Sequence, residues 1–260
     1  MRLTVLTENT VCREGLIPEH GVSFYIEAAG HRILFDMGQS DLFATHAKAL
    51  GVPLQAVDVA ILSHGHYDHG GGMAHFLQIN EHAPIYVSAH AFEPHYRADG
   101  TDIGLDRRLL ASPRIIPVED RLEIGDGLEL LSCNWLARPY GTDSAGLCME
   151  GMSPEDFRHE QYLLIREGER RILVSGCSHK GIENIVEWFR PDVLVGGFHL
   201  NKYATDGEHA APLEGIAAHL MRTPTHYYTC HCTGVPQYAF LKERMGEQIS
   251  YLACGATVQI

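Results

Sequence analysis

The chain has 260 residues, of which 45% are hydrophobic and 20% are charged, and its formal net charge is −13. This length allows one large core, and because no Pro/Gly/Ser-rich linker divides the sequence, we expect a single domain over residues 1–260. The acidic balance argues against a protein that binds the phosphate backbone of nucleic acid, where a basic surface is expected.

The seven cysteines are odd in number and form no paired Cys-x-x-Cys motifs, so we expect reduced thiols. No apolar run is long enough to span a membrane, and the first residues lack the pattern of a signal peptide because Glu8 follows a very short apolar segment. These features predict a cytoplasmic protein without a membrane partner.

In the first half of the chain, the apolar pattern predicts strands and helices in alternation after an opening β-meander. The expected elements are strands at 3–6, 22–26 and 32–35, a helix at 41–50, a strand at 56–62, a helix at about 73–79 and a strand at 85–88. This order is typical of a layered α/β protein.

Residues 90–114 are polar and show no clean period, which favours a pocket wall or lid inserted into the domain. Arg107 and Arg108 are candidates for binding an anionic group, because a guanidinium grips phosphate or carboxylate with two hydrogen bonds. The alternative is a solvated insertion whose arginines form surface ion pairs.

The second half repeats the plan of the first. Strands are expected within 118–131, at 161–165 and 171–175 as a hairpin, at 193–195 and at about 225–232, with an amphipathic helix after Gly181.

The run from Ser63 to Gly72, SHGHYDHGGG, follows a buried strand and carries most of the chemistry. His64 and His66 can project to the same side, whereas Asp68 and His69 turn the corner toward a second position. Imidazole and carboxylate suit zinc, iron(II) or manganese(II), so the run predicts half of an open, two-metal catalytic site. The glycines allow the backbone to turn where a Cβ would crowd the approach.

His179 is placed in the same way as His64, since it follows the strand ending at Ser175 and precedes Gly181 and a helix. We therefore expect it to be a metal ligand, with a helix-capping or supporting role as the alternative. His199 also lies beyond an apolar strand and could orient substrate or donate a proton.

The run SHGHYDHGGG has the H-x-H-x-D-H pattern of the metallo-β-lactamase superfamily, and the strand followed by Asp36-Met37-Gly38 resembles its first hairpin. Residues 176–179, 196–200 and 230–234 are similar to a narrower branch, the dihydropterin-methyl-aminobenzene ribofuranosyl phosphate synthase-like proteins. The resemblance implies a four-layer αββα sandwich and makes His231 the last ligand. A separate clip of Cys230, His231 and Cys232 is the alternative, but adjacent positions on a strand point to opposite faces.

The chain departs from the superfamily in two places. Many members have a separate histidine in the middle of the chain, where only His159 is available, and a bridging aspartate after the Gly that is here Gly176. Cys177 occupies that place. Either it reaches a metal as a thiolate, or water alone bridges, which we prefer because a buried cysteine more often behaves as a small apolar residue.

The expected centre therefore contains two divalent cations, with zinc favoured and iron or manganese as alternatives. The expected ligands are His64, His66 and His179 on one cation and Asp68, His69 and His231 on the other. Asp68 and His199 are the catalytic candidates. Two cations lower the pKa of a shared water to about 7, so hydrolysis of a phosphoester, thioester or lactone in a small molecule is expected. The net negative charge of the chain does not exclude an anionic substrate, because the cations make the cavity locally positive.

Three other functions remain open. The branch resemblance implies a transferase, in which an aminobenzene derivative attacks the methylene carbon of a pterin alcohol diphosphate. A di-iron redox protein is less favoured, because no flavin-binding domain or electron entry route is evident. A noncatalytic, metal-stabilised binding protein is the fourth possibility. Oligomeric state is not encoded in any pattern that we recognise.

Overall fold

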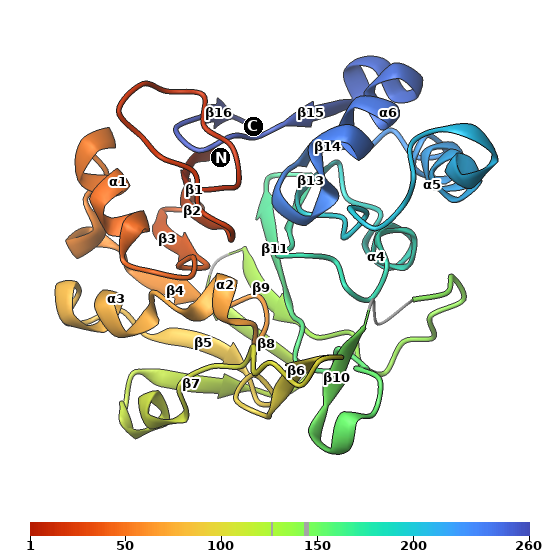
Figure 1. Cartoon of the computed structure of the whole chain (residues 1–260). Helices are drawn as coiled ribbons and strands as arrows, with labels where there is room; N and C mark the ends of the chain where they lie inside the picture. Colours follow the sequence, from red (N-terminus) through yellow and green to blue (C-terminus); the bar gives the residue numbers. More distant parts are fainter. Residues whose placement is uncertain (126, 143–145) are drawn as a thin grey trace.

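The computed structural model describes residues 1–125, 127–142 and 146–260, and its two seven-stranded sheets face each other across the centre of the molecule (Figure 1). The first sheet has the order β16-β1-β2-β3-β4-β5-β7. Its strands are β1 (Arg2–Thr7), β2 (Ser23–Ala28), β3 (His31–Phe35), β4 (Val59–Ile61), β5 (Ile85–Ser88), β7 (Ile115–Val118) and β16 (Thr257–Gln259).

The second sheet has the order β15-β14-β13-β12-β11-β9-β8. Its strands are β8 (Arg121–Gly125), β9 (Leu128–Leu131), β11 (Tyr162–Glu167), β12 (Arg170–Val174), β13 (Val193–Gly196), β14 (His226–Thr229) and β15 (Ile249–Tyr251). In both sheets an antiparallel hairpin leads into parallel strands, β2–β3–β4 in one and β11–β12–β13 in the other. The predicted repeat of the first half by the second is confirmed at this level.

Helices cover the outer face of each sheet (Figure 1). Those of the first half are α1 (Leu42–Leu50) and α3 (Met73–Ile79), and those of the second are α4 (Ile182–Phe189), α5 (Ala211–Leu220) and α6 (Val235–Met245). The short helix α2 (Tyr67–Gly70) lies near the centre of the molecule instead (Figure 1). One apolar cluster joins the facing sides of the two sheets, for example through Phe24, Leu163 and Ile172. Two further clusters join each sheet to its own helices. The layers are therefore helix, sheet, sheet and helix, as expected.

A small additional sheet pairs β6 (His95–Arg97) with β10 (Leu147–Met149). β6 belongs to the segment 90–114 that we expected to form a pocket wall. The same segment contributes the carbonyl of Ile103, which accepts the N–H of Tyr67 at the start of α2 at 2.9 Å. Thus part of the segment packs directly on the run Ser63–Gly72, which we call the motif loop.

Within the described part of the chain, every helix is too short or too polar to cross a membrane.

Candidate metal centre

The predicted ligands gather around one cavity of about 210 Å³ beyond the ends of the parallel strands. His66 and Asp68 reach it from the loop after β4, His179 from the loop after β12 and His231 from the loop after β14. His64 and His69 lie behind this lining and are fully buried. Both halves of the chain therefore supply side chains to a single site.

The motif loop depends on close contacts between backbones. A Cβ added at Gly65 would lie 2.2 Å from the carbonyl oxygen of Ala91, and one at Gly72 would lie 2.2 Å from that of Met37. Both distances are far below van der Waals contact, so only glycine fits. A side chain at these positions would thus be crowded, as predicted. The atoms that it would meet belong to neighbouring backbone segments and not to the metal positions.

His64, His66 and His179 form the first group, which we call position 1. One ring nitrogen from each lies within 4.8 Å of those of the other two. The rings of His64 and His66 are 4.7 Å apart between centroids, and that of His179 is 4.9 Å and 5.0 Å from them. Three imidazoles at this spacing can converge on one cation.

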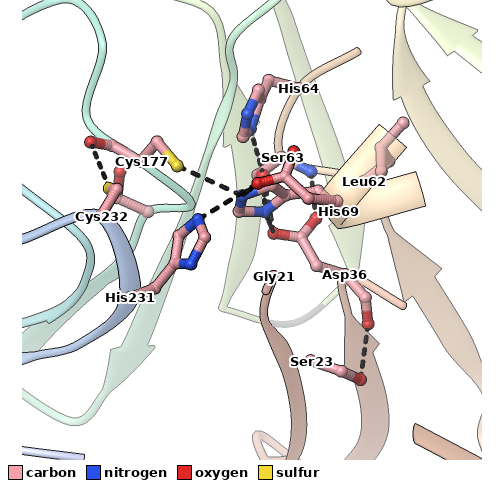
Figure 2. A network of polar contacts seen from close by, with 12 residues as sticks. Gly21, Ser23, Asp36, Leu62, Ser63, His64, His69, Cys177, His231 and Cys232 are labelled. Carbon is pink, nitrogen blue, oxygen red and sulfur yellow. Dashed lines mark hydrogen bonds and ion pairs between the residues drawn. The ribbon is translucent and has the colours of Figure 1, made fainter. Parts of the chain in front are cut away.

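Asp68, His69 and His231 form the second group, position 2, of which Figure 2 labels His69 and His231. The Oδ2 atom of Asp68 lies 3.3 Å from Nε2 of His231 and 3.7 Å from Nε2 of His69. His20, which was not predicted, adds a third imidazole, with Nε2 at 3.2 Å from the same oxygen. Asp68 is thus the centre of position 2.

Four of the candidate histidine ligands are contacted at one ring nitrogen by a partner, which leaves the other nitrogen for a cation. The pairs are Ser63 Oγ with His64 Nδ1 at 2.8 Å, Asp36 Oδ2 with His69 Nδ1 at 2.7 Å, Asn9 Oδ1 with His231 Nδ1 at 2.7 Å, and Glu155 Oε2 with His66 Nε2 at 3.3 Å. Metal-binding histidines commonly have such partners, which fix the tautomer and the ring orientation.

Glu155 is shared by three rings. Besides His66, its carboxylate receives Nδ1 of His95 at 2.6 Å and contacts Nε2 of His159 at 3.0 Å. The N–H of Gly65 donates to Nδ1 of His159 at 2.8 Å, so the ring hydrogen of a neutral His159 lies on Nε2, facing Glu155. His159 therefore lies beside position 1 and shares a group of possible metal ligands with His66, His95 and Glu155, and its Nε2 has no hydrogen-bond partner.

Burial and neighbouring charges shift the pKa values of the candidate ligands in different directions. Burial, together with the neighbouring rings, holds the pKa of His64 and of His179 well below the usual range, so both are neutral. Burial opposes charge on Asp68 as well, but His69, His20 and His231 outweigh it and lower the pKa of the carboxyl. At His69, the charges of Asp36 and Asp68 overcome burial and raise the pKa to about 9. A metal cation would replace the proton that His69 carries between two carboxylates.

Cys177 lies in the middle of the site rather than in an apolar pocket. Its Sγ is 3.2 Å from Nε2 of His69, and within 4.8 Å it shares three groups of possible ligands: with His64 and His69, with His231 and Cys232, and with His179 and His199. Burial raises the pKa of the Cys177 thiol, so the side chain is neutral without a metal.

His199 lines the cavity beside His179, with ring centroids 4.4 Å apart, and neither of its ring nitrogens has a hydrogen-bond partner. The expected arginines lie elsewhere. Arg108 is exposed and bonded to Asp106, and Arg107 lines a separate cavity. Arg97, at the end of β6, is the arginine that lines the metal cavity.

The residues that sequence reasoning missed are mostly the supports behind the ligands. Asp36 could have been found from the sequence, because it begins the Asp36-Met37-Gly38 element that follows a predicted strand. Glu155, Asn9 and His20 had none, since each lies far in sequence from the histidine or aspartate that it contacts.

The donor set fits divalent cations. Nε2 of His64 and both ring nitrogens of His179 are buried without a hydrogen-bond partner. Buried polar atoms are rarely left unpaired in proteins, and a metal ion at position 1 would satisfy them.

Comparisons with known proteins agree with this geometry. The family model of the metallo-beta-lactamase superfamily matches residues 16–139, which include the motif loop. An uncharacterized protein of Methanocaldococcus jannaschii is 30% identical over 209 residues, which are 76% of this chain and 79% of the relative. The chain belongs to the metallo-beta-lactamase superfamily.

Two further relatives have more informative names. The crystal structure of a metal-dependent hydrolase of the beta-lactamase superfamily superposes with a TM-score of 0.84 at 27% identity, covering 100% of this chain and 99% of that one. The 7,8-dihydropterin-6-methyl-4-(beta-D-ribofuranosyl)-aminobenzene-5'-phosphate synthase of Methanocaldococcus jannaschii is 27% identical over 93% of this chain and 90% of the relative. The superfamily and its fold are thereby confirmed, and the chain is similar to both a hydrolase and a synthase.

Proposed function

We propose that this protein is a hydrolase that binds two divalent cations and cleaves an ester-type bond, a phosphoester, thioester or lactone, in a small anionic molecule. The observation that carries the proposal is the meeting of positions 1 and 2 in one cavity, with Asp68, His66 and His179 all lining it. Two adjacent cations lower the pKa of a shared water to about 7 and stabilise negative charge on an attacked oxygen.

The residues of the chain have separate tasks in such a reaction. Asp68 presents one carboxylate oxygen to His20, His69 and His231, so it can orient water at the cavity floor and hold a proton. His199 has two unpartnered ring nitrogens in the cavity and can donate a proton to the leaving group. Arg97 stands at the exposed rim, where its guanidinium can bind an anionic part of the substrate.

The test is elemental analysis of the purified protein together with His66→Ala, with phosphodiesterase, thioesterase and lactonase assays on both. About two cations per chain, with turnover lost in the variant, would support the proposal. A chain without stoichiometric metal, or activity that His66→Ala leaves unchanged, would overturn it.

A second candidate is the transferase, and it is favoured by similarity to the synthase over nearly the whole of both chains. In that reaction the same cations would neutralise the diphosphate that leaves the pterin methylene carbon. Formation of a carbon–nitrogen bond between a pterin-methyl diphosphate and an aminobenzene ribofuranosyl phosphate, followed by chromatography, distinguishes it from hydrolysis. Two irons with a visible chromophore would instead favour a redox protein.

A further inference from the structure

The loop after β12 brings a sulfur atom to the place where positions 1 and 2 meet. Gly176 makes this approach possible, because a Cβ there would lie 2.1 Å from Oγ of Ser63 and 3.0 Å from Nδ1 of His64. Its carbonyl oxygen accepts the N–H of Gly197 at 2.8 Å, which fixes the loop to the end of β13. The next residue, Cys177, is 3% exposed.

From this loop the Sγ atom of Cys177 lies close to candidate ligands of both position 1 and position 2. Its distance of 3.2 Å to Nε2 of His69 places it at position 2, and its group with His64 includes a ligand of position 1 (Figure 2). Cys177 also shares one group of possible ligands with His231 and Cys232 and another with His179 and His199.

Two independent observations point to a cation beside this sulfur. His64 is fully buried with an unpartnered Nε2, and it shares a group of possible ligands with Cys177. His179 is 5% exposed with two unpartnered ring nitrogens, and it shares a second group with Cys177. A sulfur surrounded by imidazole nitrogens that lack hydrogen bonds is the arrangement of a metal ligand rather than of an apolar filler.

Resting on the two-metal centre of the proposed function, we propose that Cys177 is a metal ligand whose thiolate is shared between positions 1 and 2, in place of a bridging carboxylate. On metal binding the thiol proton is released to solvent, and the sulfur forms its bonds to the cations without any change of oxidation state. This reverses our preference for water alone as the bridge. A thiolate also narrows the choice of metal, since soft ligands favour zinc over manganese or magnesium.

Cys232 is the nearest alternative source of sulfur, and its contacts differ. Its Sγ accepts the N–H of His199 at 3.3 Å and lies 3.5 Å from the carbonyl oxygen of Cys177, which accepts the S–H. A thiol can satisfy both contacts at once, as acceptor in one and donor in the other. Cys232 is therefore held by backbone groups on two sides, whereas the Sγ atom of Cys177 contacts a ring nitrogen of His69.

The test uses the whole chain loaded with cobalt(II), which shows a thiolate-to-metal charge-transfer absorption only when sulfur is bound. We expect this absorption in the wild type and in Cys232→Ser, and its loss in Cys177→Ser and Cys177→Asp. Cys177→Asp restores a carboxylate at the bridge and is expected to keep about two cations per chain. Cys254→Ser, at a buried thiol that contacts Leu6 and His46, controls for loss of a core cysteine.

The outcomes separate this inference from the proposed function. Two bound cobalt ions without the charge-transfer absorption, or an absorption lost in Cys232→Ser and kept in Cys177→Ser, would overturn the role of Cys177 and leave the two-metal centre standing. A wild-type chain that binds no cobalt would overturn both. Circular dichroism of each variant establishes that a lost absorption does not reflect unfolding.

Discussion

Glu155 shows how one residue without direct access to substrate can decide the geometry of a metal ligand. Its carboxylate lies among the rings of His66, His95 and His159. Burial alone would raise the pKa of this carboxyl, but the contacts with the three rings outweigh burial and lower it. With Nε2 of His66 occupied by Glu155, the remaining nitrogen, Nδ1, is the one left for a cation.

Replacing Glu155 with Gln should weaken metal binding at position 1 by about 10–100-fold, because an amide NH₂ would face ring N–H groups that now meet an oxygen. Competition with a chromophoric chelator measures the change. Glu129→Gln is the matched control, since Glu129 is another buried carboxylate, paired with Arg166 outside the site. Wild-type affinity in Glu155→Gln would show that the carboxylate does not orient His66.

The same residues show what sequence could and could not predict. His64, His66, Asp68 and His69 were predictable because their spacing of one to three residues alone brings them together. Glu155 was not, since its approach to His66 depends on how residues 150–160 pack over the motif loop. The local pattern brings the candidate ligands together, whereas the groups that contact them from behind depend on tertiary structure.

Among the elements, the small sheet of β6 and β10 forms part of the cavity wall. β6 contributes Arg97 and β10 contributes Leu147, and both line the cavity beside Tyr67. One guanidinium next to apolar side chains suits a substrate with an anionic group and an organic body.

Replacing Arg97 with Ala should raise KM for anionic substrates about tenfold or more and leave kcat little changed, because hydrogen bonds to charged groups contribute about 1.5–3 kcal/mol. Steady-state kinetics on an anionic and a neutral substrate of similar size measure the effect. Arg107→Ala is the control, as Arg107 lines a separate cavity. An equal loss on both substrates would mean that Arg97 does not recognise charge.

Element prediction succeeded where apolar residues alternate or recur clearly, as in β2, β3 and α4. It missed α5 and α6, which begin near Pro212 and Pro236; α5 is mostly apolar and is interrupted by Gly215, and α6 carries several polar residues. Their helical state depends on packing against the second sheet, for example through Leu213, rather than on a strong pattern of their own.

On the scale of the whole molecule, the acidic surface and the cation-binding centre are complementary. The chain carries a net charge of −13, yet its central cavity collects imidazoles whose unpaired nitrogens are costly to bury without a metal. The fold is therefore expected to be coupled to metal binding.

Removal of metal by a chelator should lower the melting temperature by on the order of 10 °C, since free metal at 1,000 times Kd contributes about 4 kcal/mol. Differential scanning calorimetry with and without chelator measures this shift. The double variant His66→Ala, His231→Ala should respond little. An unchanged melting temperature in the wild type would show that the cations do not stabilise the fold.

His231 contacts residues near the start of the sequence, so these contacts form late during synthesis of the chain. Its backbone N–H donates to Glu8 Oε1 at 2.6 Å, and its Nδ1 lies 2.7 Å from Asn9 Oδ1. At translation rates of about 5–20 residues per second, these partners emerge from the ribosome roughly tens of seconds apart. Position 2 therefore closes only after residue 231 has been made, and a nascent chain can assemble His64, His66 and His179 around position 1 before position 2 is complete.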